Sequence, residues 1–132
     1  MLGEIINLQA LGDSRGGLVV AEAQRHIPFE VKRVYWIHGT QVGVERGFHA
    51  HKALRQVAVA VSGACEMVLD DGTETASVTL EASDRGIVIE PNMWHYMKNF
   101  TPDCVLLVFA DAHYDEADYI RDYNEFIRST KS

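Results

Sequence analysis

The segment "RGFHAHK", residues 46–52, places two of the chain's six histidines, His49 and His51, two positions apart. In a β-strand, residues i and i+2 point to the same face, so both imidazoles would reach the same pocket. Neutral imidazole binds metal ions, and an imidazole also takes and gives protons near neutral pH. The segment therefore indicates either a metal site or acid–base catalysis.

A longer pattern surrounds this pair and extends to a third histidine, His95. The first block, residues 43–63, has Gly43, Gln56 and Gly63 around the pair. The second block, residues 86–99, has Gly86, Pro91 and Asn99 around His95. This pattern resembles the two signature motifs of the cupin superfamily. In metal-binding cupins, two histidines, a glutamate and a third histidine hold one divalent ion inside a jelly-roll barrel. Here Gln56 stands at the glutamate position, and His95 follows Pro91 by four residues rather than five.

The exchange of glutamate for Gln56 bears directly on metal binding. A neutral amide is a poor replacement for a carboxylate ligand, and the site loses its negative charge. Three histidines can still hold zinc or iron, so a metal site remains an alternative. Because a cupin barrel is a deep pocket that restricts water, we favour proton transfer by histidine, without a metal or an organic cofactor.

Several short apolar segments must position these histidines. Branched and aromatic residues predict strands, and "DDG" predicts a hairpin turn. Turn signals recur about every ten residues, which favours an all-β antiparallel sandwich or barrel. The predicted strands are 31–38, 54–61, 86–91 and 104–110, with a hairpin over 65–80.

The end of the chain has a different pattern. Tyr119, Ile120, Tyr123 and Ile127 are spaced by three or four residues, with acidic residues before them and basic residues after. This spacing and charge order predict a C-terminal helix over 114–127 that packs on the barrel.

Composition narrows the class of protein. The 132 residues are 47% hydrophobic, which predicts a single domain over 1–132. The net charge of −7 argues against nucleic acid as a partner. We expect no membrane partner, because no run of 18 apolar residues occurs, and no signal peptide. Cys65 and Cys104 lie in apolar segments and predict buried free thiols, which suit the cytoplasm.

The chain also resembles one particular family. "RVYWI", "RGFHAHK", "LDDG", "PNMWH", "DCVLLVFA" and "HYDEADYIRDYNEF" are similar to the WxcM-like cupins, the nucleotide-sugar 3,4-ketoisomerases, from about Leu8 to Phe126. The resemblance implies an isomerase that acts on dTDP-4-keto-6-deoxy-D-glucose without metal or organic cofactor. Its 3-keto product would supply a PLP-dependent aminotransferase on the way to 3-amino-3,6-dideoxy sugars of a bacterial lipopolysaccharide or S-layer glycan.

Individual residues carry the resemblance further. His49 and His51 match the proposed catalytic pair of the family. Tyr35 and Arg46 match pocket residues near the sugar and the phosphates, and Lys52 is a further candidate for the diphosphate. We expect His49 to be the base at C3 and His51 to relay protons, although these two roles are interchangeable on the sequence.

Arg15 and His95 match positions that differ between family members giving different C4 stereochemistry. Arginine with histidine resembles the subgroup that makes the axial C4 hydroxyl, the xylo product. The family also forms homodimers, and a strand lent to a partner would suit the early segment "EIINLQAL", residues 4–11.

Three other functions compete with this interpretation. A metal-dependent cupin enzyme would use His49, His51 and His95 as ligands. A non-catalytic cupin would bind a sugar nucleotide and exchange no carbon-bound protons. A 3,5-epimerase would exchange protons at C3 and C5 rather than at C4.

Overall fold

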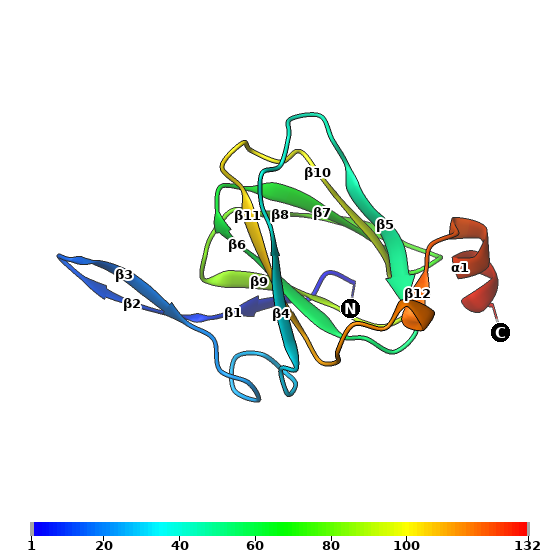
Figure 1. Ribbon diagram of the computed structural model, residues 1–132, viewed down its shortest axis with the longest axis horizontal. Helices are drawn as coiled ribbons and strands as arrows, with labels where there is room; N and C mark the ends of the chain where they lie inside the picture. Colours follow the sequence, from blue (N-terminus) through cyan, green and yellow to red (C-terminus); the bar gives the residue numbers. More distant parts are fainter. Residues whose placement is uncertain (1, 132) are drawn as a thin grey trace.

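The computed structural model describes residues 2–131, which form two five-stranded antiparallel sheets packed face to face. This is the cupin jelly-roll sandwich that the sequence predicted, and it carries a C-terminal helix (Figure 1). The first sheet has the order β1 (Ile5–Asn7), β9 (Arg85–Ile89), β6 (Gln56–Ser62), β11 (Val105–Ala110) and β4 (Arg33–Ile37). The second has the order β12 (Tyr119–Ile120), β5 (Arg46–His51), β10 (Trp94–Lys98), β7 (Cys65–Asp70) and β8 (Thr75–Leu80).

The main core lies between the two sheets. Ile87 and Leu106 from the first sheet are fully buried, as are Met67 and Leu69 from the second. Burial of each such side chain contributes about 2 kcal/mol to stability. Cys65 and Cys104 also lie in this core as free thiols, as predicted. Some of these core side chains, Met67 and Leu106 among them, also line a cavity between the sheets.

Smaller apolar clusters cover the outer faces of both sheets. Ile27 and Phe29 of the N-terminal segment pack on Val57 and Val59, outside the first sheet. Outside the second sheet, helix α1 (Tyr123–Ser129) packs through its buried Phe126 on a cluster that includes Ala50, Trp94 and Ile120. The strands that carry the histidines are therefore fixed from behind.

The prediction of one helix over 114–127 was wrong. The chain forms a 3-10 helix η1 (Glu116–Asp118) and the strand β12 before α1 begins. The side chain of Asp122 accepts hydrogen bonds from the backbone N–H groups of Asn124 and Glu125, which starts the helix at Tyr123. Tyr119 pairs with His51 across the sheet instead of lying on a helix. The residues with three- and four-residue spacing thus belong to two different elements, Tyr119 and Ile120 to β12 and Tyr123 and Ile127 to α1.

A two-stranded hairpin projects from the sandwich. Strands β2 (Gln9–Asp13) and β3 (Gly16–Val20) pair with each other and point away from the barrel (Figure 1). Within the early segment 4–11, β1 pairs with β9 of the same chain. Within residues 2–131, no helix is long and apolar enough to cross a membrane.

Candidate active site

A cavity of about 380 Å³ opens between the two sheets. His49 and His95 lie on its wall from the second sheet, and Tyr35 and Gln56 face them from the first sheet. This volume is within the range of small-molecule sites. Further lining residues include Arg33, Trp36, Arg46, Tyr114 and Tyr119.

A β-bulge in β5 brings Arg46 into the same cavity as His49. In the pairing with β10, Gly47 lies opposite Tyr96 and His49 lies opposite His95, so Phe48 is an extra residue. Residues three apart on a regular strand face opposite sides. The extra residue reverses the alternation between Arg46 and His49, so both side chains face the cavity. Phe48 has φ 58° and stacks on Tyr96 with ring centroids 4.6 Å apart. The bulge thus places a cation and a base on one wall.

Gly47 is required at this bulge. Its φ is 109°, a conformation that side chains other than glycine rarely adopt. A Cβ atom at Gly47 would lie 2.9 Å from the Cα atom of Tyr96 and 3.1 Å from the carbonyl oxygen of His95. Any larger residue would therefore push β5 away from β10, and His49 away from His95.

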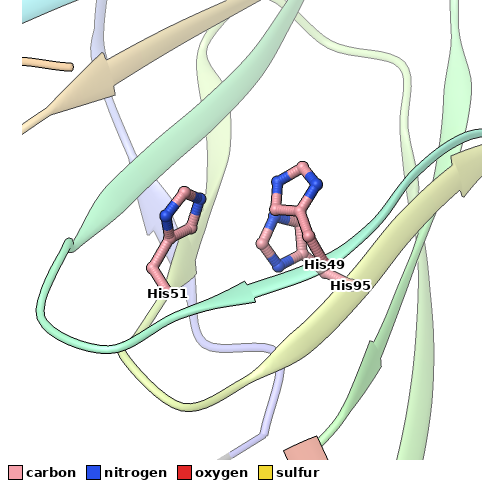
Figure 2. Close-up of side chains that lie close together, drawn as sticks. All are labelled: His49, His51 and His95. Carbon is pink, nitrogen blue, oxygen red and sulfur yellow. The ribbon is translucent and has the colours of Figure 1, made fainter. Parts of the chain in front are cut away.

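The three histidines form a compact cluster (Figure 2). The ring centroid of His49 lies 5.0 Å from that of His51 and 4.7 Å from that of His95. One ring nitrogen from each lies within 4.8 Å of the others. Figure 2 shows all three side chains pointing to one side, from β5 and β10. The sequence pattern thus predicted correctly that His95 would join the pair.

Hydrogen bonding differs among the three rings. Nδ1 of His95 lies 3.0 Å from the carbonyl oxygen of Met93, so Nδ1 carries the hydrogen and donates it, and Nε2 keeps its lone pair. Nδ1 of His49 and Nδ1 of His51 are buried without a hydrogen bond. Oδ2 of Asp118 lies 3.5 Å from Nδ1 of His51, which is close contact but lacks hydrogen-bond geometry.

Burial makes all three histidines neutral at neutral pH. It lowers the pKa of His49, and burial followed by the neighbouring His49 lowers the pKa of His51 to about 4. Burial, again followed by His49, lowers the pKa of His95 to about 3. Neutral imidazoles accept protons, so the cluster is a set of bases.

Tyr35 and Gln56 form the opposite wall. The hydroxyl of Tyr35 donates a 2.6 Å hydrogen bond to Oε1 of Gln56. Burial, with a smaller contribution from Tyr119, raises the pKa of Tyr35 to about 12, so it stays protonated. Gln56 is 1% exposed, and its oxygen is occupied by this bond.

Two arginines give the cavity a positive charge. Within residues 2–131, neither Arg33 nor Arg46 makes an ion pair. The guanidinium of Arg33 lies 5.4 Å from the ring centroid of Tyr35 and 5.8 Å from that of Tyr114, and its buried Nε has no hydrogen bond. Unpaired guanidinium groups beside a cavity favour a bound anion such as a diphosphate.

Two predicted binding residues, Arg15 and Lys52, lie outside the cavity. Arg15 sits at the tip of the β2–β3 hairpin, where it pairs with Asp13, and its side chain is 88% exposed. Lys52 follows the inward-facing His51, so strand alternation turns it outward, and its Nζ donates to the carbonyl oxygen of Ala117. Lys52 is exposed and lies outside the lining of the cavity.

Sequence reasoning missed Tyr119 and Asp118. We expected Tyr119 to pack on a helix face, but its ring centroid lies 4.3 Å from that of His51 and 5.2 Å from that of His49. The helical spacing of this segment did not indicate the short strand β12, which places Tyr119 there.

The two tryptophans lie in different surroundings. Trp94 packs under α1, whereas Trp36 is 59% exposed and lines the cavity.

The donor set of the cluster bears on metal binding. One ring nitrogen from each histidine lies within 4.8 Å of the others, so three imidazoles could hold an ion here. Gln56 offers no negative charge, and Tyr35 already occupies its oxygen. The donor set suits proton transfer better than metal binding.

Comparisons with known proteins agree with the fold and identify the family. The chain matches the WxcM-like, C-terminal family over residues 1–131. It is 46% identical to the TDP-4-oxo-6-deoxy-alpha-D-glucose-3,4-oxoisomerase of Aneurinibacillus thermoaerophilus, covering 96% of this chain and 91% of that protein. A 3,4-ketoisomerase from Helicobacter canadensis has a TM-score of 0.95 and 44% identity, with 98% of each chain covered. The QdtA 3,4-ketoisomerase from Thermoanaerobacterium thermosaccharolyticum, solved as a double mutant with TDP, has a TM-score of 0.95 and 39% identity, covering 98% of this chain and 94% of that one.

The chain therefore belongs to the WxcM-like, C-terminal family. It is an isomerase of the intramolecular oxidoreductase class, to which sugar-nucleotide 3,4-ketoisomerases belong.

Proposed function

We propose that this protein converts dTDP-4-keto-6-deoxy-D-glucose into the dTDP-3-keto-6-deoxy sugar, with the xylo configuration at C4. The observation that carries this proposal is the cluster of neutral His49, His51 and His95 beside a cavity with two unpaired arginines. A relative, QdtA, was solved as a variant in complex with TDP-4-keto-6-deoxyglucose, which supports the substrate. Arg15 and His95 are the residues on which the xylo product rests.

The reaction removes a proton from C3, adds one to C4 and transfers the hydroxyl proton from O3 to O4. His49 lines the cavity and takes the C3 proton, which the C4 carbonyl acidifies. The electron pair of the broken C3–H bond gives an enediolate across C3 and C4. The hydroxyl proton passes from O3 to O4, and an imidazole delivers a proton to C4. The product is a C3 ketone, and no atom is gained or lost.

Tyr35 and the arginines would stabilise the negative charges of the enediolate and of the diphosphate. The Tyr35 hydroxyl, protonated because of its raised pKa, would turn its one hydrogen from Oε1 of Gln56 to the enediolate oxygen when substrate binds, and each such donor contributes about 3 kcal/mol. Arg46 with Arg33 would bind the diphosphate at the cavity. No metal or organic cofactor takes part in this scheme. Histidine has the proton-transfer chemistry that it requires.

We place the reaction before a PLP-dependent amination that leads to a 3-amino-3,6-dideoxy sugar of a lipopolysaccharide or S-layer glycan. The two buried free thiols support a reducing compartment, the cytoplasm.

We infer that the protein works as a homodimer. The β2–β3 hairpin exposes Leu11, Leu18 and Val19, and an isolated two-stranded hairpin is marginal in water. Trp36 and Val61 add exposed apolar surface on the first sheet. A second copy would cover these groups, and Arg15 at the hairpin tip could then reach the cavity of that copy.

The test of the reaction is proton NMR of the chelator-treated protein with dTDP-4-keto-6-deoxy-D-glucose in deuterated water. We expect a 3-keto product with deuterium at C4, and the coupling or loss of H4 assigns its configuration. Activity that returns only with added metal would contradict the metal-free scheme. Label at C3 and C5 would indicate an epimerase, and no exchange would indicate a binding protein.

The test of the dimer is light scattering coupled to size-exclusion chromatography. The wild type is expected to elute as a dimer and Leu18→Glu as a monomer, with Val42→Glu, at another exposed apolar position, as the control. A wild-type monomer at micromolar concentration would contradict the homodimer and the placement of Arg15.

A further inference from the structure

A second cavity, of about 320 Å³, lies on the other side of the histidine pair. His51 and Asp118 line it, together with the exposed Ala53 and Ala112. Tyr119 and Arg33 line both cavities and so separate them. The two catalytic histidines therefore face different spaces, since His49 lines the first cavity and His51 the second.

Asp118 is held rigidly at the wall of this second cavity. Its Oδ1 accepts a 2.9 Å hydrogen bond from the backbone N–H of Ala53, and its Oδ2 accepts one of 3.3 Å from that of Leu54. The same Oδ2 lies 3.5 Å from Nδ1 of His51. A fixed carboxylate beside an imidazole stabilises its protonated form through their opposite charges.

His49 and His51 are close enough to exchange a proton through one intermediate. Their nearest offered ring nitrogens lie within 4.8 Å, which two hydrogen bonds of about 2.8 Å can span through one water molecule or one sugar hydroxyl. At the outer side, Asp111, His113 and Asp115 continue the polar lining of the second cavity. These groups complete a polar path from His49 to the surface.

We propose that the second cavity is the route by which protons pass between solvent and the histidine pair while substrate fills the first cavity. This inference rests on the proposed isomerase function. The proton from the broken C3–H bond goes to His49, then to His51, and leaves through the second cavity. A solvent proton returns by the same route and forms the new C4–H bond, so the balance of protons is unchanged. Asp118 is a positioning residue for His51.

The inference has an isotopic consequence. If solvent protons enter behind His51, an open route washes out the C3 proton, and the product carries deuterium at C4 in deuterated water. If the route is filled, the original protium stays with the histidines and is handed back to C4. Retention of protium at C4 therefore measures how open the second cavity is.

The experiment is a single turnover in deuterated water with substrate protonated at C3, followed by a borohydride quench and NMR of C4. Ala53→Leu and Ala112→Leu each fill the second cavity from an exposed position, so the core is untouched. We expect both to retain several-fold more protium at C4 than the wild type. Ala117→Leu is the matched control, because Ala117 is exposed next to Asp118 in the sequence and lines neither cavity.

Asp118→Asn is the second arm, since asparagine keeps the oxygen that accepts from Ala53, gives up the longer bond from Leu54 and removes the negative charge beside His51. It should lower kcat several-fold with KM unchanged and should also raise protium retention. Equal protium in the wild type and in every variant would overturn the inference while leaving the isomerase intact. Absence of any 3-keto product from the wild type would overturn the proposed function and the inference with it.

Discussion

The hydroxyl of Tyr35 donates a 2.6 Å hydrogen bond to Oε1 of Gln56, across the first sheet from β4 to β6. The bond occupies the side-chain oxygen that would otherwise be free for a ligand. It also turns the amide into a fixed part of the wall, at the position where metal-binding cupins carry a carboxylate. The pair therefore leaves the histidine cluster without a carboxylate beside it, in keeping with the proton transfer that we propose.

Gln56→Glu should convert the cluster toward a metal site. The new carboxylate faces three neutral imidazoles and supplies the charge that the native site lacks, so zinc affinity should rise by at least about tenfold. Isomerase activity should fall, because the imidazole lone pairs become ligands. Zinc titration by calorimetry measures the first effect. Gln41→Glu is an exposed control. Unchanged zinc affinity would show that the imidazoles cannot close around an ion.

His49→Asn and His51→Asn should each lower kcat by roughly 10²- to 10⁴-fold, the usual range for a lost acid or base. Affinity for dTDP should stay within about threefold of the wild type, because the arginines bind the phosphates. Steady-state kinetics and calorimetry separate the two effects. His38→Asn, at an exposed position, is the control. Parallel loss of turnover and nucleotide affinity would mean that these histidines are structural.

Arg33→Gln and Arg46→Gln should each weaken dTDP binding by about 10- to 100-fold, since a charge-assisted hydrogen bond contributes roughly 1.5–3 kcal/mol. The loss should shrink at high salt, where the wild type binds less tightly as well. Calorimetry at two salt concentrations measures both. Arg128→Gln on the exposed side of α1 should bind like the wild type. If only Arg46→Gln had an effect, Arg33 would serve the protein fold rather than the ligand.

Stability should fall as the pH drops from about 6.5 toward 4. Burial lowers the pKa of His51 to about 4 and that of His95 to about 3, whereas both titrate near 6.5 when unfolded. Below pH 6.5 the unfolded chain takes up protons that the folded chain refuses, so the free energy of unfolding decreases with falling pH. The loss should be roughly 2–3 kcal/mol per histidine. Urea unfolding at pH 7 and pH 4.5 measures it.

His95→Asn should flatten this pH dependence, and the exposed His38→Asn should not. The variants need no activity for this comparison. An equal slope in His95→Asn and the wild type would indicate that His95 titrates normally in the folded protein.

The strands of the barrel follow from the sequence because their signals are local. Branched residues in segments such as 54–61 and the "DDG" turn need no tertiary information, and they predicted β6 and the β7–β8 hairpin correctly. The i, i+2 rule placed His49 and His51 on one side of β5, as the structure has them. Local pattern therefore sufficed for these strands and for the direction of the histidine pair, whereas the jelly-roll arrangement was predicted from the resemblance to cupins.

The residues around that centre depend on contacts that no local pattern shows. Tyr119 and Asp118 reach His51 only because β12 pairs with β5 across a long sequence separation, and helical spacing in the same segment pointed elsewhere. Lys52 lies one residue beyond the inward-facing His51 and turns outward. Arg15 lies on a projecting hairpin, so its place in any site depends on a second chain.

Because of the bulge at Gly47 and Phe48, the number of residues in β5 determines which of its side chains face the cavity. Arg46 and His49 share a cavity because one surplus residue stands between them in the pairing with β10. Exchanging the side chain of Phe48 would alter a stacking contact on the outer face, but deleting Phe48 would restore a regular ladder and turn Arg46 to the opposite face. The deletion of one residue between Arg46 and His49 would therefore damage the site more than most substitutions of Phe48.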